Sequence, residues 1–434
     1  MSGTFEALRI RNYRVYATGT LVSNVGTWMQ RVAQDWLVLV VTGGSAGALG
    51  ITTGLQFLPT LLFSAVAGVL ADRFPKRKIL VVAQIAMGLT ALLLGVLAVT
   101  ESVSTWHIYV LAFVFGTGSA FEVPARQTFV HDMVDRDRLT NAVGLNSASF
   151  NLARMIGPAV AGGLISLAGS GVRATGWVIM LNAASYVAVL ISLSRIRVDE
   201  LRPAQQLTSS KGQLAAGVRY VRSRPDIMLV MATVFCCGTF GLNFQMTTAL
   251  MATDVYDKGA GEYGLLGSIV AVGSLVGSLL AARRKVSRQR LVVVAAIVFG
   301  LTEIVAGLMP SYLTFALILP LCGLTALTVI TAANAFVQVA SDPLMRGRVM
   351  ALYMMIFMGG TPFGAPALGW IADAFGARWT MIGGGALTVI GTLISAAVFS
   401  RPQGVALSAS WQAGPHLNLV IRESQEAVET VASG

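Results

Sequence analysis

The amino-acid sequence predicts an all-α membrane protein with twelve transmembrane helices, arranged as two related six-helix halves. The chain is strongly apolar: 55% of its 434 residues are hydrophobic and 12% are charged, whereas about 25% of the residues in soluble domains are charged. So much apolar surface does not fit into a single soluble core. Apolar segments of membrane-spanning length recur along the chain, and the second half weakly repeats the first.

A helix needs about 20 apolar residues to cross the hydrocarbon core of a bilayer. Six segments of this kind occupy the first half of the chain, near residues 15–41, 48–70, 79–99, 106–128, 144–167 and 175–194. Six more occupy the second half, near 227–250, 263–282, 291–308, 313–335, 349–372 and 379–399. The first and fourth segments contain several polar residues, so their limits are the least sharply defined.

The repeat supports a division into two halves. An offset of 207 residues aligns Phe129-Val130 with Phe336-Val337, Asp135 with Asp342, and Gly157, Gly162 and Gly169 with Gly364, Gly369 and Gly376. The segment that follows the second span has a degenerate counterpart after the eighth, at 277–285, which lacks the acidic residue. We therefore expect six-helix halves at 1–194 and 227–400, a basic central loop at 195–226 and a tail at 401–434.

The basic residues predict the orientation. If both termini lie in the cytoplasm, the cytoplasmic segments contain 25 of the 31 lysines and arginines, the external segments contain three, and the spans contain three. This asymmetry follows the positive-inside rule. We expect a multi-pass protein of a bacterial inner membrane with both termini in the cytoplasm. Because the basic residues form short clusters between apolar segments and no single patch, nucleic acid is not an expected partner.

Several classes of function have no support in the sequence. Cys236, Cys237 and Cys322 lie within predicted spans and are interpreted as small buried apolar residues. The three histidines are scattered, and neither a nucleophile–base set nor a phosphate-binding loop is found. We expect no enzyme activity, no metal, no cofactor and no ATP-driven pumping.

The segment from Gly68 to Leu80, GVLADRFPKRKIL, lies between the second and third spans. Its charges predict a tight hairpin at a membrane face, because ionised groups are costly in hydrocarbon. The spacing resembles the loop signature of the major facilitator superfamily, with Pro75 in place of the family's second glycine. Segments 26–33, 125–158 and 217–225 are similar to the drug and siderophore exporter branch, which includes the enterobactin exporter and macrolide efflux proteins.

The resemblance implies two parallel halves that hold substrate between them near the midplane. It also implies a conformational latch, in which Asp72 faces the N-terminus of the eleventh span. A carboxylate beside helix amides gains typically 0.3–1 kcal/mol. The alternative, a solvated basic turn, explains the cations but not the spacing of glycine, leucine and aspartate. The expected latch residues are Gly68, Asp72, Arg73, Lys76 and Arg77.

A second motif lies in the fifth span. Gly157, Pro158, Gly162 and Gly163 resemble the antiporter motif of the family, with Ala161 replacing one of its glycines. The motif implies export in exchange for protons. Glycine and proline are also common in membrane helices that carry no such function.

Charged groups within the spans are the candidates for energy coupling. Asp35 and Glu122 lie at two depths, and each has an arginine four residues away, Arg31 and Arg126 respectively. Residues four apart share a helix face. Two interpretations remain open: pairing with arginine would make each carboxylate a fixed structural ion, whereas burial would make it a proton carrier. Glu303, in the ninth span, is expected at the outer surface.

Other polar and aromatic residues of the first, fifth and seventh spans are candidates for the substrate cavity, because these spans line the cavity in the resembling fold. They are Asn24, Trp28, Gln34, Asn146, Asn151, Arg154, Asn243 and Gln245. For any one of them, ordinary packing is an equally good explanation.

Together these features predict a secondary active transporter that exports amphipathic small molecules in exchange for protons. The expected partners are the lipid bilayer, protons and a small-molecule substrate, and we expect a monomer. An uptake symporter or uniporter on the same fold is one alternative, since fold alone does not set function. A membrane sensor or lipid scramblase without carrier activity is the other.

Overall fold

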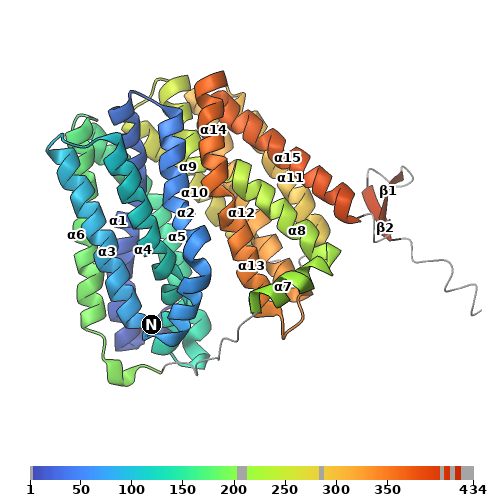
Figure 1. Ribbon diagram of the computed structural model, residues 1–434, viewed down its shortest axis with the longest axis horizontal. Helices are drawn as coiled ribbons and strands as arrows, with labels where there is room; N and C mark the ends of the chain where they lie inside the picture. Colours follow the sequence, from blue (N-terminus) through green and yellow to red (C-terminus); the bar gives the residue numbers. More distant parts are fainter. Residues whose placement is uncertain (1–2, 203–212, 283–287, 401–404, 411–415, 422–434) are drawn as a thin grey trace, which may run out of the picture.

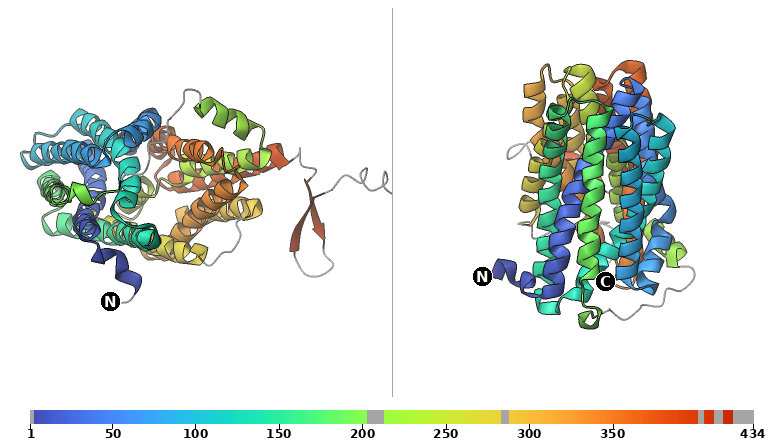
Figure 2. Two further views of the ribbon diagram at one scale, coloured as in Figure 1. Left: turned by 90° about the horizontal axis from the view of Figure 1, so that it is seen from below. Right: turned by 90° about the vertical axis from the view of Figure 1, so that its left-hand side faces the viewer.

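The computed structural model describes residues 3–202, 213–282, 288–400, 405–410 and 416–421. Helices dominate, and they gather into two groups that follow the order of the chain (Figure 1). Seen from below, helices α1 to α6 form one group and helices α8 to α15 form the other (Figure 2, left). The predicted all-α membrane class is confirmed.

The first half begins with a short 3-10 helix, η1 (Gly3–Arg9). Six long helices follow: α1 (Arg11–Thr42), α2 (Ala46–Arg73), α3 (Lys76–Val99), α4 (Thr105–Met133), α5 (Arg136–Leu167) and α6 (Val172–Ser194). The turns between them are short. The side chain of Ser45 accepts a hydrogen bond from the backbone nitrogen of Ala48 and so caps α2.

Between the halves lie η2 (Val198–Glu200) and helix α7 (Gln213–Arg222). The seventh span is interrupted and consists of α8 (Pro225–Cys236), the π-helix η3 (Cys237–Gly241), α9 (Phe244–Leu250) and the π-helix η4 (Met251–Val255). The remaining helices are α10 (Ala260–Ala282), α11 (Gln289–Gly307), α12 (Tyr312–Ala340), α13 (Arg346–Gly359), α14 (Thr361–Phe375) and α15 (Arg378–Ser400). Helices α13 and α14 together form the eleventh span.

In the described part of the chain, eleven helical segments are long and apolar enough to cross a membrane. Helix α1 is not among them, because polar side chains interrupt its 32 residues; it packs between α5 and α6 as a twelfth long helix. Tryptophans at positions 106, 177, 370 and 379 are each at least 50% exposed and lie near one end of the bundle. Such a belt is typical of a membrane interface.

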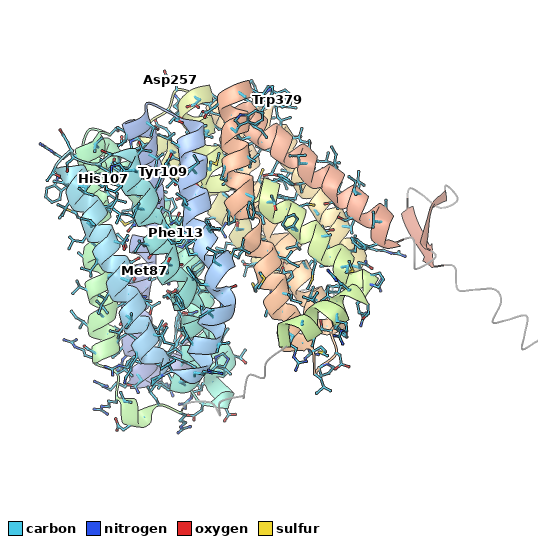
Figure 3. The ribbon with its side chains drawn as sticks, in the orientation of Figure 1. Met87, His107, Tyr109, Phe113, Asp257 and Trp379 are labelled. Carbon is cyan, nitrogen blue, oxygen red and sulfur yellow. The ribbon has the colours of Figure 1, made fainter. Side chains whose placement is uncertain are left out.

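The two ends of the bundle differ in charge. We call the end that carries Lys76, Arg138, Arg224 and Arg346 the basic end. His107, Asp257 and Trp379 mark the opposite end (Figure 3). The counterpart of the hairpin in the second half falls partly on residues 283–287, which lie outside the described residues.

The halves make their closest backbone approaches toward the opposite end. There, a Cβ added at Gly50 of α2 would lie 2.5 Å from the carbonyl oxygen of Ala365 in α14, so the two helices approach almost backbone to backbone. One hydrophobic cluster joins the first half to this end of the second half, while the basic end of the second half has a separate cluster of its own. The two groups diverge toward the basic end (Figure 1).

The C-terminal tail contains a feature that was not expected from the sequence. Strands β1 (Val405–Ser410) and β2 (His416–Ile421) pair in an antiparallel hairpin. The hairpin lies beside the end of α15, away from the helix bundle (Figure 1).

Candidate functional site

The site is built on one face of α1. Asn24, Trp28, Arg31 and Asp35 are spaced four, three and four residues apart, so they form a stripe along the helix. On α5, a matching stripe contains Ser147, Asn151, Arg154 and Pro158.

Trp28 joins these two stripes. The ring of Phe150 meets the Trp28 ring edge-on, with 5.7 Å between centroids. The guanidinium carbon of Arg31 lies 4.9 Å from the Trp28 ring centroid, and that of Arg154 lies 5.6 Å from it. Two arginines from different helices therefore share one indole, a favourable cation–π arrangement.

Gly157 makes room for this indole. A Cβ at Gly157 would lie 2.6 Å from the Cβ of Trp28 and 3.1 Å from the carbonyl oxygen of Val25. Any larger residue would therefore push α5 away from α1. The first glycine of the antiporter-like motif thus has a defined packing role.

A third arginine, Arg126 of α4, extends the assembly. Its guanidinium carbon lies 5.7 Å from the Phe150 ring centroid. Its Nε lies 2.8 Å from Oε1 of Glu122, and both side chains are largely buried. We call Trp28, Arg31, Arg126, Phe150 and Arg154 the arginine–aromatic cluster. Glu122 and Arg126 thus form an ion pair within α4, one of the two arrangements that the sequence left open.

Arg31 and Asp35, the other pair that helix spacing allowed, form no ion pair within 4 Å. Nη1 of Arg31 donates to Oε1 of Gln245 in α9, at 3.4 Å, and its Nε has no hydrogen-bond partner. Asp35 accepts a 2.8 Å hydrogen bond from the hydroxyl of Tyr263 in α10. Both side chains thus reach across to the second half, which sequence spacing could not reveal.

The charges of the cluster are not balanced. Within the described residues, no carboxylate oxygen lies within 4 Å of the guanidinium of Arg31 or of Arg154. Isolated charges at membrane depth cost about 2.5–3.5 kcal/mol each on insertion scales, and they mark functional positions in membrane proteins.

The other predicted cavity residues differ in whether their amide groups have hydrogen-bond partners. Asn24 and Gln34 each have an amide nitrogen without a partner, and both lie on α1. Asn151 donates to the carbonyl oxygen of Ser147 within its own helix, and Asn146 is partly exposed on α5. Asn243, between η3 and α9, donates to the carbonyl oxygen of Thr239, while its own amide oxygen has no partner. It therefore belongs to the interrupted part of the seventh span.

The remainder of the antiporter-like motif closes the site toward the opposite end. A Cβ at Gly162 would lie 2.9 Å from the Cα of Gly264 in α10. The backbone nitrogen of Ala159 donates to Oγ of Ser268 in α10, at 3.1 Å. By contrast, no heavy atom lies within 4 Å of a Cβ at Gly163. Small residues let these two helices touch.

At the basic end, the described residues of the hairpin contact their own half. Nζ of Lys76 lies 2.7 Å from Oδ1 of Asp132, and Nε of Arg77 donates to the carbonyl oxygen of Leu193 at 2.7 Å. Arg73 is exposed, and a Cβ added at Gly68 would have no heavy atom within 4 Å. The side chain of Asp72 lies outside the described residues.

A carboxylate that the sequence did not single out joins the halves at the opposite end. Asp373, near the end of α14, accepts hydrogen bonds from the backbone nitrogens of Ala46, at 3.0 Å, and Gly47, at 2.9 Å. These are the first residues of α2 in the other half. The sequence shows an acidic residue near the end of the eleventh span and the start of the second span. It does not show that these two features are in contact.

The expected position of Glu303 was also wrong. It was assigned to the outer surface, but its side chain is only 2% exposed and one carboxyl oxygen has no hydrogen-bond partner. It packs against Gly241 in the π-helix η3 and Gly385 in α15. Within the described residues, no group of three potential metal ligands is found.

The chain is similar to known bacterial membrane transport proteins. A family model described as transmembrane secretion effector matches residues 2–429. The multidrug efflux pump Tap of Mycolicibacterium fortuitum is 26% identical over 83% of this chain and 89% of its own length. Macrolide efflux protein A of Streptococcus pyogenes is 23% identical over 87% and 93%. The staphyloferrin A transporter of Staphylococcus aureus is 23% identical over 81% and 87%.

Solved structures share the fold at low identity. A point mutant of the nucleoside transporter NupG superposes with a TM-score of 0.71, at 12% identity, over 90% of this chain and all of that one. A bacterial homologue of the human lysosomal transporter Spinster, in an inward-facing and occupied conformation, gives 0.68, at 16% identity, over 89% and 97%.

Proposed function

Because this chain belongs to the transmembrane secretion effector family of the major facilitator superfamily, we propose that it exports amphipathic small molecules from the cytoplasm in exchange for protons. Its relatives are named for the efflux of drugs and macrolides and for the transport of a siderophore. The chain itself is a multi-pass membrane transporter.

The observation that carries the proposal is that the closest contacts between the halves lie on one side of the polar and aromatic site. Toward the opposite end, the halves meet at Gly50–Ala365, Gly162–Gly264 and Asp373–Ala46. Toward the basic end, their hydrophobic clusters are separate. With the basic end placed in the cytoplasm by the positive-inside rule, this conformation is the one that takes up cargo for export.

Asp35 is the carboxylate best placed to couple this movement to protons. Glu122 has an arginine partner within its own helix, whereas Asp35 is bonded to a neutral hydroxyl in the other half. A proton on Asp35 would change the contact with Tyr263, and separation of the halves would expose the carboxyl to water. Protonation and conformation are thereby linked through one bond.

The test compares Asp35→Asn with Tyr263→Phe in inside-out vesicles, using whichever of two dyes, fluorescein or rhodamine 123, the wild type carries. Asp35→Asn should abolish accumulation driven by a pH gradient but preserve downhill exchange. Tyr263→Phe keeps the carboxyl and should still accumulate dye. Glu122→Gln serves as the second carboxylate variant and should weaken packing without uncoupling.

Two results would count against this assignment. If Asp35→Asn still concentrates dye against its gradient, Asp35 does not carry the proton. If Tyr263→Phe loses accumulation to the same extent, the hydrogen bond between the halves is what matters.

A further inference from the structure

The positive charge of the arginine–aromatic cluster indicates which charge the transported molecule carries. Of its three arginines, only Arg126 has a carboxylate within 4 Å among the described residues. Arg31 and Arg154 approach the same Trp28 ring from α1 and α5. Among the described residues, the site therefore presents two guanidinium groups that have no carboxylate oxygen within 4 Å.

Both guanidiniums keep hydrogen-bonding capacity. Arginine has five N–H donors and no acceptor. Arg31 uses one of them in a long hydrogen bond to Gln245, and its Nε is unpartnered. The structure gives Arg154 no hydrogen bond to any described residue, and its partner is the Trp28 ring. Both side chains are partly exposed.

The surroundings of these donors are aromatic. Trp28 and Phe150 form an edge-to-face pair beside them, and Phe57 of α2 lies 5.7 Å from the guanidinium carbon of Arg31. Guanidinium groups match the planar, bidentate geometry of a carboxylate or phosphate. Aromatic rings supply apolar contact area for the rest of a ligand.

We propose that this site selects organic anions, namely amphipathic cargo that carries a carboxylate or another oxyanion on an aromatic or apolar body. The proposal rests on the proposed export function and narrows its substrate class. Arg31 and Arg154 bind the oxyanion, and Trp28 and Phe150 contact the body. A cationic drug would meet two guanidinium groups that have no ion-pair partner among the described residues, and it would be disfavoured.

The location of the site favours a role in cargo binding over a static one. Arg31 and Arg154 come from two helices of the first half, and Gln245, which contacts Arg31, comes from the second half. An anion held by both arginines would therefore lie at the junction of the halves. Substrate at that position can favour one arrangement of the halves over the other.

The experiment compares two dyes with the same xanthene core. Fluorescein carries a carboxylate, whereas rhodamine 123 is cationic and has a methyl ester in its place. Initial rates of proton-driven accumulation are measured in inside-out vesicles that contain the full chain. The wild type should prefer fluorescein. Arg31→Gln and Arg154→Gln should each reduce the fluorescein rate about tenfold, as expected for loss of a charge-assisted hydrogen bond, and leave the rhodamine 123 rate unchanged or higher.

Two variants serve as controls for this effect. Arg173→Gln removes an exposed arginine at the opposite end, where it pairs with Glu101, and should change neither rate. Arg31→Lys keeps the charge without the planar fork and should recover part of the fluorescein rate. Elution of each purified variant as a single species by size exclusion verifies its folding.

The possible failures are distinguishable. A wild type that prefers rhodamine 123, or arginine variants that slow both dyes equally, would overturn the anion proposal while leaving export intact. A wild type that moves neither dye, in vesicles with a verified proton gradient, would contradict the proposed export of amphipathic molecules and the anion proposal with it.

Discussion

At the residue scale, the motifs were easier to foresee than their partners. The antiporter-like motif of Gly157, Pro158 and Gly162 was visible in the sequence, and the structure places Gly162 against α10. Gly157 makes room for Trp28, and two arginines lie over the Trp28 ring. Both contacts depend on the relative rotation of α1 and α5. The spacing of residues along the sequence does not specify that rotation.

The contact between Gly157 and Trp28 gives a prediction. Gly157→Ala places a methyl group 2.6 Å from the Cβ of Trp28, and neither that atom nor the nearby backbone can move away easily. Such overpacking costs about 1–3 kcal/mol. Thermal unfolding of the purified variant should shift to lower temperature, and fluorescein transport should fall because the cluster is displaced.

Gly163→Ala is the matched control, because it lies in the same helix and its Cβ would have no heavy atom within 4 Å. It should unfold at the wild-type temperature or slightly above it. Equal destabilisation by both substitutions would mean that general helix flexibility, and not the Trp28 contact, explains Gly157.

At the element scale, helix identity was well predicted and helix continuity was not. Each of the twelve predicted segments overlaps a helix or a run of consecutive helices. The seventh and eleventh spans, however, are broken, by η3 and η4 and at Gly359–Thr361 respectively. Hydropathy is averaged over many residues, so it cannot resolve a one-turn change in hydrogen bonding.

Asp373 suggests an electrostatic lock between α14 and α2. Its carboxylate accepts hydrogen bonds from the first two nitrogens of α2, where the helix dipole is positive. Asp373→Asn removes the charge with little change of shape, at a cost of up to about 1 kcal/mol because the residue is exposed. The ratio of basic-end-open to basic-end-closed molecules should fall by about fivefold or less.

Distances between spin labels on α4 and α12 at the basic end would measure this shift. Glu101→Gln is the control, since it removes a carboxylate at the same end whose ion-pair partner, Arg173, belongs to its own half. A distance distribution identical for Asp373→Asn and the wild type would mean that glycine packing alone holds this end closed.

At the scale of the whole molecule, composition and the repeat were sufficient to predict the membrane class and the two helix groups (Figure 1). The conformation was not predictable, because one sequence must support at least two arrangements of its halves. Contacts such as Asp35–Tyr263 join two helices that are far apart in the sequence, and their partners depend on how the halves are arranged. Spacing along α1 therefore suggested Arg31 as the partner of Asp35, while the structure shows a partner in the other half.

The central claim is that the arginine–aromatic cluster is reached from the cytoplasm through the basic end. Ser147 tests it most directly, because this exposed residue lies on the same face of α5 as Arg154, toward the basic end. Ser147→Cys is introduced after the three native cysteines are replaced by alanine. A membrane-impermeant thiol reagent is then applied to inside-out vesicles and to intact cells. Ser102→Cys, in the loop at the opposite end, reports the other face.

The account predicts that Ser147→Cys is labelled in inside-out vesicles and protected in intact cells, while Ser102→Cys shows the reverse pattern. Bound fluorescein should slow the labelling of Ser147→Cys without affecting Ser102→Cys. Labelling of Ser147→Cys from the outside of intact cells, with Ser102→Cys reached only in inside-out vesicles, would contradict both the orientation and the proposed direction of transport.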